Sequence, residues 1–337
     1  MSYCFKKPKK LLFAFLGFVL ISISCSKKEK EKETPAPPTP VFTANANPSW
    51  KVESRCFTEG IPGSFDDLAV KDPSIVSFAG KYHLFYTARS KNVGGWQMGY
   101  AAASQVSQLN VSPRTYMSTL NGGSYFCAPQ VFWFSSKNKW YLIYQSGLGA
   151  SFSTNSDINY ANAWSAGASM GFGDGIDFWC ISDDSYIYCF YSAQDGSKTI
   201  KRRRTRIENF PYGWEAATIA ATNTFEAPHV YKNKSDGKYY MIVEDIARHQ
   251  ELWAATNLAG TWNQVAEKWA SIDNLSFIGE HWTDQVSHVE ALRAGIDEKM
   301  EIENINHLDL LIQGVTKEGY SGDYANIAYD LGLIHNY

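Results

Sequence analysis

A pair of short apolar strands joined by a polar turn recurs along the chain. Each copy is rich in aromatic and β-branched residues on both sides of a turn that contains Gly, Asn, Asp or Lys, a pattern typical of a β-hairpin. The copies, of which the last is the most divergent, begin at Asp72, Ala128, Gly175, Glu226 and Val286 and read DPSIVSFAGKYHLFYTA, APQVFWFSSKNKWYLIYQ, GIDFWCISDDSYIYCFYS, EAPHVYKNKSDGKYYMIVED and VSHVEALRAGIDEKMEIENI.

This repeat predicts an all-β, five-bladed β-propeller over residues 48–337. Its spacing is about 50 residues, which matches one four-stranded blade, and no helical pattern of useful length interrupts it. A two-sheet sandwich is the alternative, but a sandwich does not require regular repetition. In a propeller the first strand of every blade lines the central axis, so residues at equivalent positions converge at one mouth of the channel.

The first residues have the pattern of an export signal. Four lysines, ending at Lys10, precede the stretch LLFAFLGFVLISIS, which is too short for a comfortable membrane span. We interpret residues 1–24 as a lipoprotein-type signal peptide, because ISISC resembles a bacterial processing site at which Cys25 becomes lipidated, although Ser22 stands where Leu is commoner. Residues 25–47 are charged and then Pro-rich, as in a solvated linker. We therefore expect an exported lipoprotein, periplasmic or on the outer membrane or cell surface, anchored through its N-terminal lipid.

Four cysteines remain in the mature part of the chain: Cys56, Cys127, Cys180 and Cys189. A turn centred on Asp184 would place Cys180 directly across from Cys189, so a disulfide and a pair of free buried thiols are both open alternatives. No CxxC pair suggests zinc.

The composition is that of a globular protein without a bias toward nucleic acid. The chain has 337 residues, 45% of them apolar, and a formal net charge of −3, which gives no attraction for a polyanion. In the basic run at 201–206, Arg202, Arg204 and Arg206 would share one face of a strand, and we interpret this run as a solvated outer strand. We expect no nucleic-acid partner, and we expect a monomer.

The repeat places three carboxylates at one level of the channel. The matched positions are Asp72 in the first unit, Pro129 and Gln130 in the second, Asp177 in the third, Glu226 in the fourth and His288 in the fifth. Taken singly, each acidic residue has an ordinary structural interpretation, such as a turn residue before proline for Asp72. Carboxylates that were merely solvated turn residues, however, would not be expected to recur at equivalent positions of a repeat.

Two carboxyl groups across a cleft are the catalytic groups of glycoside hydrolysis. One of them is protonated and the other is ionised. A third carboxylate can keep the acid protonated, because a nearby like charge raises its pKa. Aromatic residues could stack on sugar rings at the mouth, although most Trp residues are expected in the blade cores; the candidates are Trp96, Trp133, Trp179 and Tyr324.

The chain also resembles glycoside hydrolase family 62, α-L-arabinofuranosidases that remove arabinose branches from xylan and arabinan. The resemblance covers roughly residues 50–337 and rests on these segments in order: KDPSIV, APQVFWF with NKWYLIYQ, IDFW followed by DD, FEAPHVYK, SHVE, and GDY with LGLI. It implies that Asp72 is the general base acting on water, that Asp177 tunes and orients the acid, and that Glu226 is the general acid. The reaction would invert the anomeric centre.

The same resemblance implies the binding residues. Lys71 and Gln130 would line the arabinose pocket, and Tyr324 would stack at the rim against the chain that carries the branch. His288 matches the histidine beside a calcium ion in the channel, where it would act partly through water and the ion would be structural. The open alternative for His288 is a hydrogen-bonded core histidine. No organic cofactor is expected, and the expected partner is arabinose-substituted xylan or arabinan.

Several positions depart from the family pattern. Ser146 stands where QWG is usual, Val289 replaces the Gly of SHGE, Ala325 follows Tyr324 where Asn is common, and Asp330 replaces an Arg in the final strand. None removes a carboxylate of the trio. The alternatives are an enzyme of the related family 43, which shares the five-bladed design and acidic trio, and a surface glycan-binding propeller without turnover. Clustered like charges argue against the second, because a binding site gains little from them.

Overall fold

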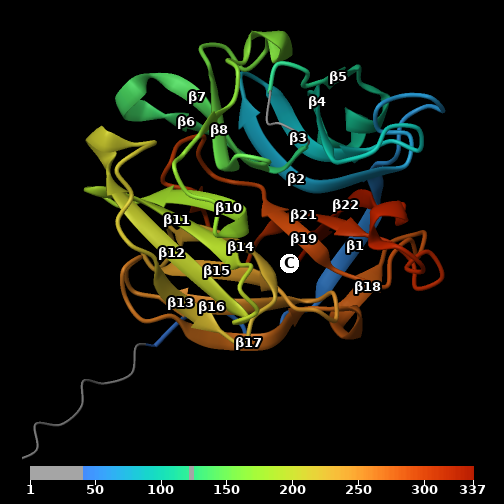
Figure 1. The fold of residues 1–337 in the computed structure, drawn as a ribbon. Coiled ribbons are helices and arrows are strands. Elements are labelled where there is room, and N and C mark those ends of the chain that lie inside the picture. Colours follow the sequence, from blue (N-terminus) through green and yellow to red (C-terminus); the bar gives the residue numbers. More distant parts are fainter. Residues whose placement is uncertain (1–40, 121–124) are drawn as a thin grey trace, which may run out of the picture. The chain divides into compact units, whose positions relative to one another are not determined.

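The computed structural model describes residues 41–120 and 125–337, which form five β-sheets arranged as the blades of a propeller (Figure 1). The first blade contains β2 (Ala69–Phe78), β3 (Lys81–Arg89), β4 (Gln97–Ala103) and β5 (Arg114–Tyr116). The second contains β6 (Phe126–Phe134), β7 (Lys139–Ser146), β8 (Gly149–Asn155) and β9 (Ala168–Ser169). The third contains β10 (Gly175–Ser182), β11 (Tyr186–Ala193), β12 (Thr199–Arg206) and β13 (Thr218–Thr222). The predicted five-bladed β-propeller is confirmed.

The last two blades have an added strand each. The fourth contains β14 (Glu226–Asn233), β15 (Tyr239–Glu244), β16 (Gln250–Ala255) and β17 (Asn263–Ala270), with β20 (Glu301–Ile302) beside β14. The fifth contains β19 (Ser287–Ala291), β21 (Asp309–Gly314), β22 (Asp330–His335), β1 (Trp50–Phe57) and β18 (Leu275–Phe277). Short 3-10 helices connect strands: η1 (Val106–Val111), η2 (Ser135–Lys137), η3 (Ala161–Ala163), η4 (Ile207–Asn209), η5 (Ile272–Asn274) and η6 (Tyr324–Asn326).

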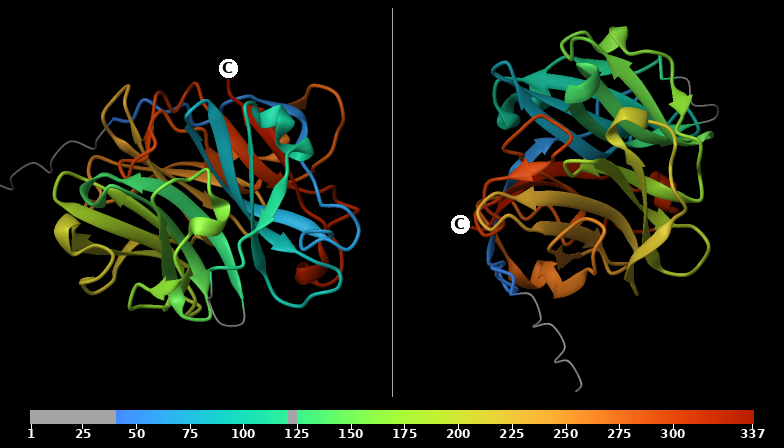
Figure 2. Two further views of the ribbon diagram at one scale, coloured as in Figure 1. Left: turned by 90° about the horizontal axis from the view of Figure 1, so that it is seen from above. Right: turned by 90° about the vertical axis from the view of Figure 1, so that its left-hand side faces the viewer.

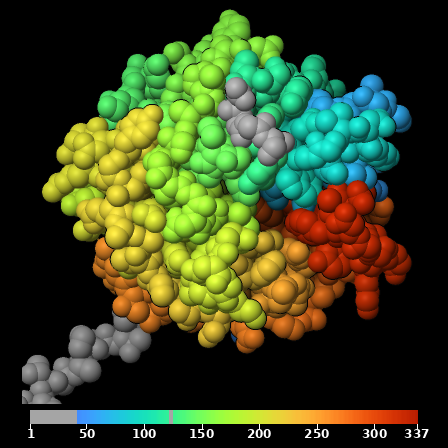
Figure 3. Space-filling model, viewed as in Figure 1, coloured from blue at the N-terminus to red at the C-terminus, as the bar shows by residue number. Residues whose placement is uncertain are grey.

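The ring closes because β1, near the start of the described chain, pairs antiparallel with β22 near its end. The blades follow one another in sequence order around the propeller, as the colours of the space-filling view show (Figure 3), and two turned views show the same sheets from the edge (Figure 2). Fully buried aromatic side chains such as Trp50, Trp140 and Trp269 fill the blade interiors. This burial agrees with the expectation that most Trp residues belong to the cores.

The fifth hairpin differs from its prediction. The sequence pattern joins the strand at His288 to MEIENI, but β19 pairs with β21, and β20 instead lies parallel to β14, with Lys232 opposite Glu301. The segment MEIENI therefore extends the fourth blade.

The third blade places Cys180 opposite Cys189, as the turn predicted, and both thiols are buried and free. The basic strand β12 is not an outer edge, because it pairs with β11 on one side and β13 on the other. Arg202, Arg203 and Arg204 are partly buried, while Arg206 is exposed. The guanidinium of Arg202 donates to the backbone carbonyls of Leu258, Ala259 and Gly260. Since these carbonyls lie between β16 and β17, the bonds join the third blade to the fourth.

Residues 41–47, which we expected in the linker, contact the propeller. Phe42 packs edge-on against Tyr240, with ring centroids 6.3 Å apart. The backbone N–H of Asn45 donates to Oδ1 of Asn306 (2.7 Å). The folded part therefore begins before residue 48. The predicted signal peptide and Cys25 lie outside the described residues, and no helix in the described part of the chain is long and apolar enough to cross a membrane.

The five inner strands share a β-bulge at the same level. The ladder shifts register directly after Lys71, Cys127, Ile176, Glu226 and Ser287 in β2, β6, β10, β14 and β19. In four blades the next residue has a positive φ, as found in left-handed backbone: Asp72 (45°), Ala128 (50°), Asp177 (56°) and Ala227 (56°). A bulge bends the strand and redirects a side chain. The repeat therefore turns one or two side chains per blade toward the axis.

Candidate active site

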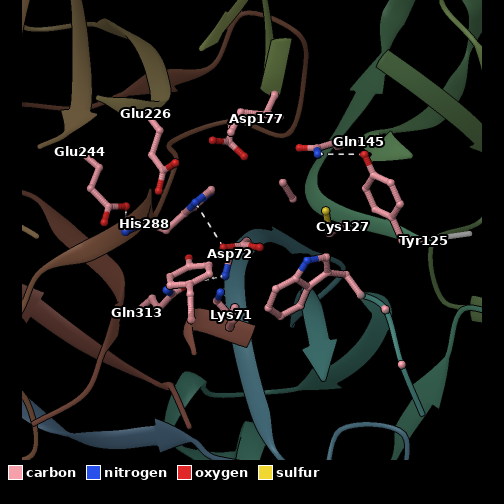
Figure 4. A pocket seen from close by; sticks show the side chains of 16 residues that line it. Lys71, Asp72, Tyr125, Cys127, Gln145, Asp177, Glu226, Glu244, His288 and Gln313 are labelled. Atoms are coloured by element: carbon pink, nitrogen blue, oxygen red, sulfur yellow. Dashed lines mark hydrogen bonds and ion pairs between the residues drawn. The ribbon is translucent and has the colours of Figure 1, made fainter. Parts of the chain in front are cut away.

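The bulges surround a cavity of about 620 Å³ at one end of the channel (Figure 4). Its wall contains all three carboxylates of the predicted trio, Asp72, Asp177 and Glu226. It also contains four of the other expected residues, which are Lys71, Trp96, His288 and Tyr324. Cys127 and Gln145 of the second blade also line it, so residues from all five blades meet in one pocket.

The common register of the trio needs one correction. Asp72 and Asp177 occupy the left-handed position of their bulges, but in the fourth blade that position belongs to Ala227. Glu226 lies one residue earlier, at the level of Lys71 in the first blade. Since a bulge turns both residues toward the axis, Glu226 still faces the pocket.

Gln130 does not line the pocket, contrary to our expectation. It lies two residues beyond the left-handed position of Ala128 and is fully buried. Its amide is used within the fold, because Nε2 donates to the carbonyl of Cys180 (2.7 Å) and Oε1 accepts from the N–H of Cys180 (2.7 Å). Gln130 therefore joins two blades below the pocket.

Asp72 is held from two sides. Its backbone N–H donates to Oε1 of Gln313 (2.9 Å), and its Oδ1 lies 3.3 Å from Nδ1 of His288. Burial lowers the pKa of His288 to about 4, despite the nearby Asp72 charge that raises it. His288 is therefore neutral at physiological pH, and it orients the Asp72 carboxyl without forming a full ion pair.

Asp177 and Glu226 have raised pKa values. Burial and the charge of the adjacent Glu244 together raise the pKa of Glu226 to about 7, although Arg248 opposes this rise. The pKa of Asp177 is raised well above its usual range, first by burial and then by the charges of Glu226 and Asp72. Both carboxyls can thus carry a proton near neutral pH.

A fourth carboxylate, Glu244, belongs to the same cluster and was missed in the sequence. It is paired in register with Glu226 and is buried. Its Oε1 accepts from the hydroxyl of Ser287 (2.6 Å) and from Nη1 of Arg248 (2.6 Å), and its Oε2 accepts from the backbone N–H of His288 (2.8 Å). The signal was available in the fourth repeat, whose second strand ends in VED.

Arg248 connects this carboxylate to the predicted acid. Its Nη1 donates to Oε1 of Glu226 (3.1 Å) as well as to Glu244. The backbone of Arg248 is left-handed, with φ of 63°, which is uncommon for a residue with a long side chain. The turn between β15 and β16 therefore directs a cation to the carboxyl of Glu226.

Lys71 lies under the aromatic rim. Its Nζ is 3.9 Å from the ring centroid of Tyr324, 4.4 Å from that of Trp96 and 5.1 Å from that of Tyr329. Burial lowers the pKa of Lys71, while the charges of Asp72 and Glu226 oppose the change. These contacts hold the three rings near the carboxylates.

The other two aromatic candidates belong to the cores. Trp179 is 2% exposed, and its Nε1 donates to the carbonyl of Val230 (2.9 Å). Trp133 packs edge-on against Trp140, with centroids 5.5 Å apart. Of the four candidates, only Trp96 and Tyr324 line the cavity.

The family model described as glycosyl hydrolase family 62 matches residues 63–335. The chain belongs to this family. Alpha-L-arabinofuranosidase C of Cellvibrio japonicus (strain Ueda107) is 32% identical to it in an alignment of 285 positions that covers 79% of this chain. The chain spans 44% of the length of that relative.

Two solved family 62 structures share the fold and most of the chain. The catalytic domain of a Coprinopsis cinerea α-L-arabinofuranosidase has a TM-score of 0.80 and 29% identity, covering 86% of this chain and 97% of that one. An α-L-arabinofuranosidase of Podospora anserina in complex with cellotriose has a TM-score of 0.78 and 28% identity, covering 87% and 98%. The resemblance stated from the sequence motifs is confirmed.

Two departures of this family 62 chain have structural partners. Asp330, which stands in place of an Arg, accepts from Nη1 of Arg55 (2.9 Å) and thus joins β22 to β1. The hydroxyl of Ser146 pairs with that of Ser151 (2.8 Å) within the second blade. Neither residue lines the pocket.

The expected calcium ion stays a prediction. Within the described ranges, no group of three His, Cys, Asp or Glu side chains is arranged to hold a metal ion. Calcium prefers six to eight oxygen ligands, and the neighbourhood of His288 does not supply such a cage from carboxylates.

Proposed function

We propose that this chain is an α-L-arabinofuranosidase that releases arabinose side chains from arabinose-substituted xylan or arabinan by an inverting mechanism. The observation that carries the proposal is the meeting of Asp72, Asp177 and Glu226, from three blades of a family 62 propeller, in one cavity. The chain spans less than half of its curated relative, so its own activity has to be measured.

In this mechanism Glu226 is the general acid. A carboxyl with a pKa of about 7 is substantially protonated at neutral pH, and it can give its proton to the glycosidic oxygen as the bond breaks. Asp177, whose pKa is raised by burial and by its acidic neighbours, orients and tunes that acid.

Asp72 is the general base. Its carboxylate would take a proton from a water molecule on the opposite face of the sugar, so that the anomeric configuration inverts. Neutral His288, 3.3 Å from Asp72, holds the carboxylate in place without contributing a competing positive charge. Lys71 offers an ammonium donor to a sugar hydroxyl.

The polymer would lie across the aromatic rim formed by Trp96 and Tyr324. Another family 62 hydrolase, 26% identical to this chain, has been solved in complex with xylotriose, and the Podospora anserina enzyme is in complex with cellotriose. We infer that a β-linked backbone lies along the rim while an arabinose branch attached to it enters the pocket.

A panel of 4-nitrophenyl glycosides tests the reaction class. We expect hydrolysis of the α-L-arabinofuranoside and much slower hydrolysis of the β-D-xyloside. Preference for the xyloside would favour a family 43-like specificity, and binding to arabinoxylan without release of any sugar would favour a glycan-binding propeller.

Substituting Glu244 by Gln is expected to move the alkaline limb of the kcat/KM profile to lower pH. Glu226 must be protonated to act, so activity falls as pH rises through its pKa. Glu244 is the negative neighbour that raises this pKa most, and its removal leaves Arg248 to interact more strongly with Glu226. Both changes lower the pKa of Glu226, and the limb should shift by about one pH unit.

The other titratable groups facing the pocket, Asp72, Asp177, Lys71 and His288, are unchanged in this variant. The Gln oxygen can still accept from the N–H of His288, and its NH2 group can donate to the hydroxyl of Ser287, so the fold should persist. The pH profile of 4-nitrophenyl α-L-arabinofuranoside hydrolysis gives the answer. A limb that stays in place or moves to higher pH would contradict the assigned coupling.

Ala325→Asn is expected to improve kcat/KM on arabinoxylan more than on a small aryl arabinofuranoside. Ala325 follows Tyr324 at the rim, where the family commonly has Asn, and its methyl group cannot hydrogen-bond to the polymer backbone. One hydrogen bond at an exposed rim contributes on the order of 1 kcal/mol, so the gain should be less than tenfold. An equal effect on both substrates would show that the residue at position 325 does not contact the polysaccharide backbone.

We also propose that the protein is an exported lipoprotein with lipid on Cys25, and that it acts as a monomer. The support is the charged, apolar and Cys-terminated order of residues 1–25. Metabolic labelling with radioactive palmitate should label the wild type, and a Cys25→Ala variant that is labelled equally would contradict the proposal.

A further inference from the structure

The second strand of every blade places one side chain opposite the bulge of the inner strand. The register pairs are Lys71 with Thr87, Cys127 with Gln145, Ile176 with Ser192, Glu226 with Glu244, and Ser287 with Gln313. The five partners on the second strands, Thr87, Gln145, Ser192, Glu244 and Gln313, therefore occupy equivalent positions, and we call them the bulge-partner ring.

Four members of the bulge-partner ring have the same structural role. Each accepts a hydrogen bond from a backbone N–H in the bulge of the following blade, a donor that the irregular ladder leaves without a strand partner. The bonds run from Ala128 to Thr87 (2.8 Å), from Ala227 to Ser192 (3.0 Å), from His288 to Glu244 (2.8 Å) and from Asp72 to Gln313 (2.9 Å).

Gln145 is the exception. By the same pattern it would accept from the N–H of Asp177, yet its recorded side-chain bond in the described structure is from Nε2 to the hydroxyl of Tyr125 (3.2 Å). Both Gln145 and Tyr125 line the cavity, and they lie across it from Glu226 and Glu244 (Figure 4). The side chain of Gln145 therefore does not join two blades as its four counterparts do, and it lines the pocket instead.

We propose that Gln145, held by Tyr125, binds a hydroxyl group of the arabinofuranosyl unit and so determines which sugar the pocket accepts. This inference rests on the proposed function and extends it to the neutral wall of the cavity. An amide presents both a donor and an acceptor, as a sugar hydroxyl does, and it leaves the charge balance of the carboxylates undisturbed. Because Gln145 lies at the level of the bulges, it would contact the sugar in the pocket and not the polymer at the rim.

The molecule contains its own matched control. Gln313 is the same residue type at the equivalent position of the fifth blade, but its amide is used within the fold: Oε1 accepts from the N–H of Asp72, and Nε2 donates to the hydroxyl of Ser287 (3.3 Å). Gln313→Leu leaves a backbone donor unpaired and should lower Tm by about 2–6 °C. Gln145→Leu removes no bond to the backbone and should leave Tm within about 1 °C of the wild type.

The experiment titrates free L-arabinose into the wild type, Gln145→Leu and Tyr125→Phe, followed by Trp fluorescence, since Trp96 lines the same cavity. Loss of one or two neutral hydrogen bonds should raise Kd about two- to tenfold in Gln145→Leu, with a smaller rise in Tyr125→Phe. KM for 4-nitrophenyl α-L-arabinofuranoside should rise in parallel, while kcat changes less.

An unchanged Kd in Gln145→Leu, or a loss of stability equal to that of Gln313→Leu, would overturn the inference. The same holds if the wild type binds no L-arabinose. The titration does not depend on turnover, so a wild type that binds L-arabinose but hydrolyses no arabinofuranoside would refute the proposed function and leave the role of Gln145 to be judged from the Kd values.

Discussion

Glu226→Gln is expected to lower kcat on arabinoxylan by at least about a hundredfold, because the amide cannot deliver a proton to the departing xylose oxygen. The change is nearly isosteric, and a Gln oxygen can still accept from Nη1 of Arg248, which lies 3.1 Å from Oε1 of Glu226. The loss should be much smaller on 4-nitrophenyl α-L-arabinofuranoside, since nitrophenolate leaves without protonation. This dependence on the leaving group is specific to a general acid.

The measurement is kcat on both substrates, with Tm and L-arabinose binding as checks on folding and on the pocket. A folded variant with near-wild-type kcat on arabinoxylan would remove Glu226 from the role of acid. An equal loss on both substrates would place its contribution elsewhere, for example in binding.

Asp72→Asn is expected to lower kcat by at least about a hundredfold on both substrates to a similar extent, since activation of water is required whatever the leaving group. Asn is the appropriate replacement because Asp72 has a φ of 45°, and Asn tolerates left-handed backbone better than most residues. The bond from the backbone N–H to Gln313 is retained, so the bulge should keep its shape.

The contrast between the two variants distinguishes base from acid. If Asp72→Asn retains activity on the arabinofuranoside while folding normally, Asp72 is not the base. If its loss depends on the leaving group as that of Glu226→Gln should, the two roles are exchanged.

The propeller was predictable because each hairpin has its own local signal. Alternating aromatic and β-branched residues, with a turn at nearly constant spacing, specify four of the five hairpins and the facing of Cys180 and Cys189. The fifth hairpin was misassigned because MEIENI has the composition of a strand, and composition does not identify the partner. The actual partner of β19, the strand β21, lies beyond an insertion.

The site was predictable only in part, because a bulge is invisible to a pattern of period two. The bulge turns two consecutive residues toward the axis, so that Glu226 at the first position and Asp177 at the second both face the pocket. Gln130 lies two residues beyond the left-handed position of its blade and is buried below the pocket. Glu244 and Arg248 were missed for another reason. Their importance arises from pairing across strands and from the turn after β15, which a comparison of inner strands alone does not examine.

The measurement that tests the central claim most directly is proton NMR of arabinoxylan during the first minutes of hydrolysis. Asp72 acting on water, opposite a proton donor at Glu226, predicts that L-arabinose appears first as the β-anomer and then equilibrates with the α-anomer. Initial release of the α-anomer would mean retention through a covalent intermediate. That result, or the absence of any released arabinose, would contradict the account of this pocket.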